Sequence, residues 1–195
     1  VMYDGTCEFA RLPHSYPKKL RELGIQCKVF LPILPLASTL YNYRDHRKIL
    51  VVDGKVAFTG GVNLADEYIN RKKIFGHWKD NALMIEGQAA ASFTSMFLEM
   101  WNIDQRIMED YNKWITPDNF IEETKKHSTS QKGYVIPFGD DPLDGEHVGK
   151  MVYIDILNHA KDYVYIMTPY LILDGEMENA LTFAAKRGVK VKLIL

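Results

Sequence analysis

The segment His46-Arg-Lys-Ile-Leu-Val-Val-Asp-Gly54 and its continuation, Lys55-Val-Ala-Phe-Thr-Gly-Gly-Val-Asn63, decide how this chain is expected to fold. Two apolar runs rich in β-branched residues flank an Asp-Gly pair, which is a strong short-range signal for a hairpin with a two-residue turn. We therefore predict a strand over residues 44–52 that returns over residues 55–59.

A two-residue turn fixes which residues of the hairpin face each other. Counting back from the turn, Lys48 faces Thr59 and His46 faces Gly61. Because side chains alternate between the faces of a strand, His46 and Lys48 project together while Arg47 points away. An imidazole that can attack phosphorus and an ammonium with three donors suit a single phosphate group.

Two further residues of the quoted stretch suit the same anion. A glycine at position 61, opposite the nucleophile, leaves room for a phosphate to approach the backbone, and Asn63 can offer its amide. The predicted phosphate-binding residues are therefore His46, Lys48, Gly61 and Asn63. A His-x-Lys pair alone is typical of a solvated surface, and it is the fixed spacing to Asp53 and to Asn63 that makes the pattern specific.

The rest of the chain alternates helical and strand-like periodicity, which is typical of an α/β protein. Strands are expected over residues 1–3, 25–31, 81–85, 163–167 and 189–195, and helices over residues 18–23, 88–101, 148–160 and 174–187. Gly24 and Gly188 each follow a predicted helix and precede a predicted strand. Any junction of a helix and a strand can look this way, so the similarity of these two segments does not by itself establish an internal repeat.

Composition and charge exclude several classes of protein. The chain has 195 residues, a net charge of −1 and a pI of about 6.7, so no overall basic excess points to a nucleic-acid partner. Two cysteines are too few for a disulfide framework, and no apolar run approaches the roughly 20 residues of a membrane span. The histidines and cysteines show no zinc-ligand spacing, so no metal and no other cofactor is expected. Both ends fall within strand-like runs, and we expect an excised part of a longer protein.

The complete pattern His46-x-Lys48-x4-Asp53-x6-Gly60-Gly61-x-Asn63 resembles the HKD motif of the phospholipase D superfamily. Further segments across nearly the whole chain resemble bacterial cardiolipin synthases, namely Tyr43-Arg-Asp-His46, Phe58 to Tyr68, Trp78-Lys-Asp80 with Ile85-Glu-Gly87, Phe97-x3-Trp101 and Thr168-Pro-Tyr170.

This resemblance implies a mixed sheet flanked by helices, with two HKD motifs facing each other across one site. One histidine attacks the phosphodiester and becomes a phosphohistidine, while the other protonates the leaving alcohol and then activates the second alcohol. Cardiolipin synthases transfer a phosphatidyl group between two phosphatidylglycerol molecules and release glycerol, without a metal. The implied partners are a phospholipid and a membrane surface, not nucleic acid, and the implied location of the full-length protein is the bacterial cell membrane.

The expected catalytic residues are His46, Lys48, Asp53 and Asp80, in different roles. Asp53 belongs to the motif, yet it sits in the turn, several residues from His46 at about 3.3 Å per residue, so we expect it to act as a scaffold. A histidine nucleophile needs a carboxylate on its other ring nitrogen to fix its tautomer. Asp80 stands where related enzymes place that carboxylate. Alternatively, Asp80 simply starts or caps the next strand.

The predicted organisation is a first phospholipase D-like half over residues 1–124, without its opening strand and helix, a linker over 125–146, and the opening of a second half over 147–195. No second His-x-Lys-x4-Asp occurs. The acid–base partner must then come from a second half or from a homodimer, and this chain alone is expected to be inactive unless it dimerises. The last strand-helix-strand can also complete the first half in circularly permuted order.

Two other functions stay open at this point. A nuclease or another phosphodiesterase of the same superfamily would use the same chemistry, although the near-neutral charge argues against nucleic acid. An inactive phosphate-binding fragment would need only His46, Lys48 and Asn63.

Overall fold

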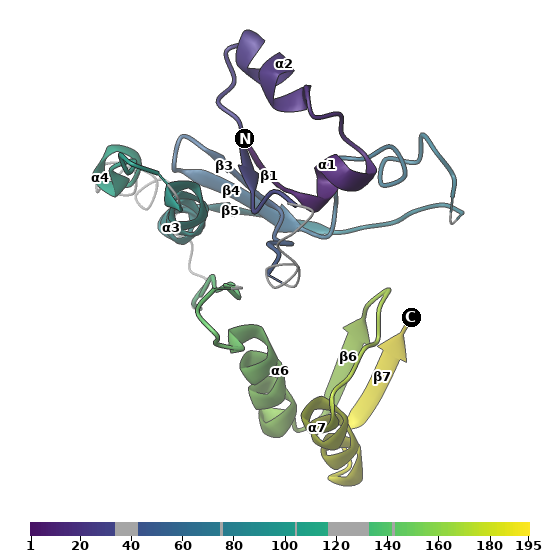
Figure 1. Cartoon of the computed structure of the whole chain (residues 1–195). Coiled ribbons are helices and arrows are strands. Elements are labelled where there is room, and N and C mark those ends of the chain that lie inside the picture. The colour runs from purple at the N-terminus through teal and green to yellow at the C-terminus, as the bar shows by residue number, and fades with distance from the viewer. Residues whose placement is uncertain (34–42, 75, 104, 117–132, 142) are drawn as a thin grey trace. The chain divides into compact units, whose positions relative to one another are not determined.

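The computed structural model describes residues 1–33, 43–74, 76–103, 105–116, 133–141 and 143–195. Contacts within the chain divide it into two units, Val1–Pro137 and Phe138–Leu195. Each unit combines helices with strands, so the fold class is mixed α/β, as predicted (Figure 1). Of the predicted linker over 125–146, residues 125–132 and 142 lie outside the described residues.

The first unit begins with a parallel strand pair, β1 (Met2–Asp4) and β2 (Lys28–Phe30). Helices α1 (Thr6–Ala10) and α2 (Tyr16–Glu22) connect the two strands. Gly24 follows α2 with a φ of 78°, the left-handed conformation predicted for a glycine at a helix end. The sequence did not predict α1, because a five-residue helix is too short to show a period.

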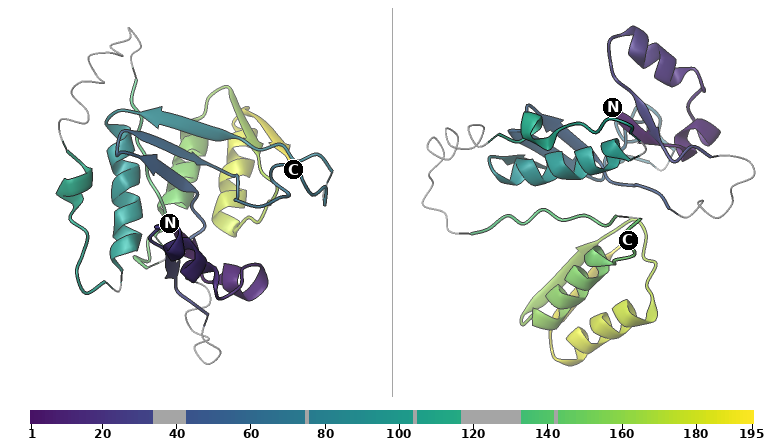
Figure 2. Two further views of the ribbon diagram at one scale, coloured as in Figure 1. Left: turned by 90° about the horizontal axis from the view of Figure 1, so that it is seen from above. Right: turned by 60° about the vertical axis from the view of Figure 1, so that its left-hand side comes forward.

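Three antiparallel strands form a second sheet in this unit, in the order β3 (Ile49–Val52), β4 (Val56–Gly60) and β5 (Ala82–Glu86). Helix α3 (Ala89–Asn102) lies along one face of this sheet, as Figures 1 and 2 show. A short helix, α4 (Tyr111–Trp114), follows it. The apolar layer between sheet and helix consists of Ala57, Ala90 and Phe93, with Ile49, Val51 and Ile85 packed against them.

The hairpin turn forms where the sequence predicts it but contains one more residue. Asp53 and Gly54 have φ values of 54° and 67°, and the Lys55 N–H donates to the Val52 carbonyl at 3.0 Å. The Lys55 carbonyl, however, accepts from the Gly87 N–H at 3.1 Å, just past β5. Lys55 therefore takes its partner from a distant segment instead of pairing with Val52, and the predicted two-residue loop is wrong.

This change shifts the predicted register by one residue. Ile49, and not Lys48, faces Thr59. Strand β3 also begins only at Ile49, because the Arg47 N–H just before it donates to the Asp45 side chain at 3.0 Å instead of to a neighbouring strand. The predicted strand is therefore wrong in its first part, and the HKD histidine and lysine lie in the extended segment that enters β3.

The second unit contains α6 (Val148–His159), β6 (Tyr163–Met167), α7 (Gly175–Lys186) and β7 (Lys190–Ile194). These bounds agree with the sequence prediction to within one residue at each end. The strands pair in parallel as a two-stranded sheet of their own. The buried core of this unit consists of Leu157, Val164, Ala180, Leu181, Ala184 and Val189.

The division of the chain into two phospholipase D-like halves stays a prediction. The idea that the last strand-helix-strand completes the first half in circularly permuted order also stays a prediction.

Within the described part of the chain, no helix combines the length and the apolar character that crossing a membrane requires.

Candidate functional site

Three segments that carry predicted site residues meet at one end of the β3–β4–β5 sheet. Residues 46–48 enter β3, residues 61–63 leave β4, and Asp80 precedes β5. Antiparallel pairing of the three strands puts these segments at the same end. The structure thus brings together five of the six predicted site residues, while Asp53 lies exposed in the turn at the opposite end.

His46 and Lys48 are neighbours in the segment that enters β3. The Lys48 ammonium donates to the His46 carbonyl at 2.6 Å. Partial burial lowers the pKa of the His46 imidazole, and the Lys48 ammonium lowers it further. The imidazole is therefore mainly neutral near pH 7, and a neutral ring has the lone pair that attack on phosphorus needs. Burial likewise lowers the pKa of Lys48.

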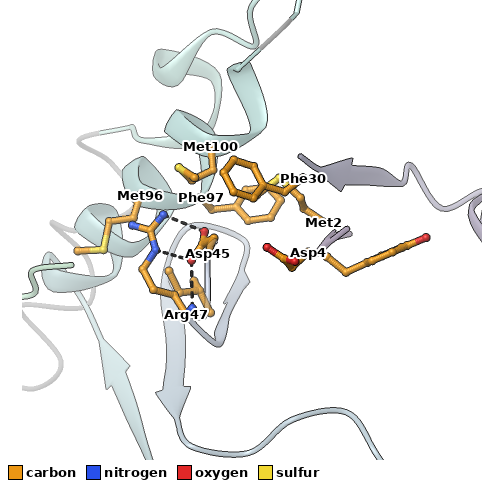
Figure 3. A pocket seen from close by; sticks show the side chains of 10 residues that line it. Met2, Asp4, Phe30, Asp45, Arg47, Met96, Phe97 and Met100 are labelled. Carbon is orange, nitrogen blue, oxygen red and sulfur yellow. Dashed lines mark hydrogen bonds and ion pairs between the residues drawn. The ribbon is translucent and has the colours of Figure 1, made fainter. Parts of the chain in front are cut away.

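Asp45 and Arg47, on either side of His46, anchor the segment to the rest of the unit. Arg47 donates to Asp45 through both Nε and Nη2, each at 2.9 Å. With Ile49, the pair lines a cavity of about 100 Å³ beside β1, β2 and α3, and Figure 3 shows it next to the methionines of α3. Since every second residue lines this cavity, His46 and Lys48 fall on the other side of the extended segment. This agrees with the prediction that Arg47 points away from them.

Two carboxylates that the sequence reasoning missed act on the histidine. The charges of Asp4, at the end of β1, and of Asp45 raise the pKa of His46, against the lowering by burial and by the lysine. Asp4 pairs with Arg44 at 3.5 Å, and its Oδ1 accepts from the Thr6 N–H and hydroxyl. Its Oδ2 is buried and has no hydrogen-bond partner in the described part of the chain. Only tertiary structure brings β1 close enough to matter here, so no local signal marks Asp4.

Asp80 reaches the site with partners other than the predicted one. Its carboxylate accepts from the Trp78 indole Nε1 at 3.1 Å and from the Asn81 N–H at 2.8 Å. Its charge, after that of Asp45, opposes the effect of burial on the pKa of Lys48. Among the described residues, no hydrogen bond joins Asp80 to the histidine ring. The orienting role of Asp80 stays a prediction.

Gly61 makes room for Asp80 and does not face His46. A Cβ at position 61 would collide with Oδ1 of Asp80, while the Gly61 N–H donates to the Asn81 carbonyl at 3.3 Å. The predicted opposition of His46 and Gly61 is wrong because of the one-residue shift in register. A side chain at position 61 would have to displace that carboxylate, so the neighbouring space is occupied by a group of the protein itself.

Asn63 completes the set of donors at this end of the sheet. It is half-buried, and its carbonyl accepts from the Ala65 N–H at 2.9 Å. No described residue accepts a hydrogen bond from its side-chain amide, which can therefore donate to a ligand. Together, the His46 imidazole can act as a nucleophile, while Lys48 and Asn63 can provide one charged and one neutral donor for phosphate oxygens.

Comparison with known proteins extends the argument to the whole chain. Residues 153–195 match the family model described as cardiolipin synthase, PLD-like domain. Over all 195 residues, the chain is 60% identical to an uncharacterized protein of Streptococcus mutans, of which it covers 41%. It is 31% identical to a cardiolipin synthase of Alkalihalophilus pseudofirmus over its whole length, and 32% identical to one of Geobacillus kaustophilus over 99% of its length.

The chain covers 37% of each of these two synthases, so it spans about two fifths of the length of the curated relatives named here. These similarities confirm the resemblance that the motif predicts.

Proposed function

We propose, from the premise that this chain is a phospholipase D-type protein related to the bacterial cardiolipin synthases, that it supplies one nucleophilic half of a phosphatidyltransferase site. The proposed reaction transfers a phosphatidyl group from one phosphatidylglycerol molecule to a second one and releases glycerol. The observation that carries this proposal is the convergence of His46, Lys48 and Asn63 at one end of the β3–β4–β5 sheet.

In the proposed first step, the His46 ring nitrogen attacks the phosphorus of phosphatidylglycerol. A P–N bond forms as the P–O bond to the headgroup glycerol breaks, and the leaving oxygen takes a proton from an acid across the site. In the second step, the hydroxyl of another phosphatidylglycerol attacks, the P–N bond breaks and the hydroxyl proton returns to the acid–base group. Lys48 and Asn63 stabilise the non-bridging oxygens as negative charge develops on them.

The acid–base group is proposed to be the histidine of a second HKD motif, because this chain contains one such motif. A second phospholipase D-like half or a two-fold homodimer partner would supply it. Residues 1–124 are proposed as the first half and residues 147–195 as the opening of the second, which the family match over 153–195 supports. Alone and monomeric, the chain is expected to show negligible turnover. The membrane of a bacterial cell is the proposed location.

The test is the variant His46→Ala in a protein of the relatives' length that contains this chain. With radiolabelled phosphatidylglycerol, cardiolipin formation is expected to fall by about 10⁴-fold or more, and ³²P-labelled enzyme is expected to disappear. His159→Ala is the matched control, because this exposed histidine lies in the second unit. Unchanged cardiolipin formation by His46→Ala would overturn the proposal.

The same assay separates the two alternatives. Cleavage of DNA without lipid transfer would indicate a nuclease of the superfamily. Binding of phosphatidylglycerol without turnover in the wild type would indicate a phosphate-binding protein.

A further inference from the structure

The connection between β4 and β5 carries a basic surface that the proposed chemistry does not use. Residues 69–79 contain no Asp or Glu, although the chain as a whole has a net charge of −1. The four basic residues of this stretch are all exposed, namely Arg71, Lys72, Lys73 and Lys79. In the described part of the chain, only Lys72 among them has an acidic partner, Asp66 at 3.9 Å. Residues 64–79 are called the β4–β5 loop below.

Contacts of Tyr68 and Asn70 with Trp78 close the base of the β4–β5 loop. Asn70 donates to the Trp78 carbonyl at 2.8 Å and accepts from the Trp78 N–H at 2.7 Å. The Tyr68 ring meets the Trp78 ring edge-on, with centroids 4.8 Å apart. Arg11 of the segment after α1 pairs with Glu67. Residues 71–74, 76 and 77, which lie beyond these contacts, project past the end of the three-stranded sheet, as Figure 1 shows.

Apolar side chains are exposed among these charges. Leu64 is fully exposed, and Ile69 and Ile74 are 56% and 60% exposed. Isoleucine side chains exposed beside several uncompensated cations are typical of surfaces that enter the headgroup region of an anionic membrane. There the cations approach lipid phosphates while the aliphatic groups leave water.

We propose that the β4–β5 loop docks this chain on an anionic lipid surface. The loop starts directly after Asn63 and ends directly before Asp80, so both of its arms lead into the candidate site. Docking through the loop would hold His46 at the level of the lipid headgroups, where the phosphodiester lies. The inference rests on the proposed function, which it deepens by naming how the site meets its substrate surface.

Flotation of the 195-residue chain with lipid vesicles tests this inference. We expect binding to vesicles of phosphatidylglycerol and phosphatidylcholine, little binding to phosphatidylcholine alone, and a decrease of binding as salt is added. The double variant Lys72→Gln/Lys73→Gln is expected to bind about 30-fold more weakly, because each basic residue near an anionic surface contributes roughly a factor of five. Lys18→Gln/Lys19→Gln on α2 removes the same charge from exposed positions of the same unit and is the matched control.

The apolar part of the loop has its own variant. Ile74→Ser is expected to weaken binding about fivefold, because its side chain no longer gains from leaving water. Leu23→Ser is the control, since Leu23 is equally apolar and 75% exposed but lies beside α2. Circular dichroism identifies any variant that fails to fold, and the two loop variants act through different forces, so that one of them remains informative.

Several results would overturn the inference. They are absence of binding to the anionic vesicles, equal losses in the loop variants and their controls, and stronger binding of the loop to DNA than to the vesicles.

A second assay separates this inference from the proposed function. In a protein of the relatives' length, Lys72→Gln/Lys73→Gln is expected to lose transfer from vesicles but to keep it with short-chain phosphatidylglycerol dissolved as monomers. His46→Ala is expected to lose transfer from both substrates and to bind vesicles like the wild type. Wild-type binding without any transfer would refute the proposed function alone, and equal transfer from vesicles by loop variant and wild type would refute the docking role alone.

Discussion

The parallel strand pairs β1–β2 and β6–β7 share the same local sequence of helix, glycine and strand. They differ in how far the ends of their strands are buried. In each pair, a helix ends at a glycine with a left-handed φ, 78° at Gly24 and 94° at Gly188. Each glycine N–H donates to a carbonyl in the last helical turn, at 2.9 Å for Gly24 and 3.0 Å for Gly188. The strand that follows then pairs in parallel with the strand before the helical segment.

The two pairs differ where their strands end. Phe30 and Ile194 are the last paired residues of β2 and β7, yet Phe30 is 2% exposed and Ile194 is 56% exposed. Phe30 belongs to the cavity lining that also includes residues of α3 and of the segment entering β3. The helix, glycine and strand are thus specified locally, whereas a strand end becomes part of a site only when other elements pack over it.

Shortening the side chains at these two strand ends is expected to give the largest difference. Phe30→Ala is expected to lower the free energy of unfolding of the first unit by about 3–5 kcal/mol, because it leaves a cavity in a packed layer. Ile194→Ala is expected to cost less than about 1 kcal/mol, because the side chain is largely in water already. All three tryptophans belong to the first unit, so denaturant unfolding followed by tryptophan fluorescence reports on that unit. Hydrogen exchange of the β6 and β7 amides reports on the second. Similar losses in the two units would contradict the comparison.

Because the two glycines share the same local conformation, substituting them is expected to lower the free energy of unfolding by equal amounts, and by less than Phe30→Ala does. Gly24→Ala and Gly188→Ala are each expected to cost about 1–2 kcal/mol, because an L-residue is strained at a left-handed φ. No atom lies within 4 Å of a Cβ built at either position, so the cost is conformational and not steric. Gly175→Ala is the control, since its φ is not left-handed and its surroundings are also open. The same two unfolding measurements apply, and clearly unequal costs would break the equivalence.

Local interactions explain which features could be predicted from the sequence. Helix α7 begins where Asp174 accepts from the Met177 N–H at 2.9 Å and ends before Gly188, and both signals are readable within a few residues. The turn at Asp53 and Gly54 is local in the same sense. The convergence of the HKD residues at one end of the hairpin also follows from the hairpin alone, because antiparallel strands return to the same end.

Tertiary contacts explain the features that could not be predicted. The register depends on a bond from Gly87 to the Lys55 carbonyl, about thirty residues away, which no turn propensity contains. The space beside Gly61 is filled by the side chain of Asp80, which comes from another segment. The charge of Asp4 acts on the histidine only because β1 packs near the segment that enters β3. Each of these contacts joins segments that are separate in sequence.

The smallest expected effect concerns the charges around His46. Asp4 ends β1, whereas Met167, which ends β6, carries no charge. Because the Asp4 carboxylate stabilises the protonated imidazole of His46, Asp4→Asn is expected to lower the pKa of His46. Lys48→Gln is expected to raise that pKa, because it removes a neighbouring positive charge. NMR titration of the imidazole protons measures both shifts, and Lys55→Gln in the hairpin turn is the control.

The pKa of His46 also determines the sign of its effect on stability. Burial and Lys48 hold the pKa below the ordinary value of 6.5, so the unfolded chain binds the proton more readily than the folded one. The contribution of His46 to folding is therefore complete above pH 6.5 and is lost as the pH falls toward the pKa of the folded state. The contribution is lost over the pH range between the pKa of the unfolded state and that of the folded state. Lys48→Gln should narrow this pH range and Asp4→Asn should widen it. An unchanged pKa in both variants would show that burial alone, and not the charges of Asp4 and Lys48, sets the protonation state of His46.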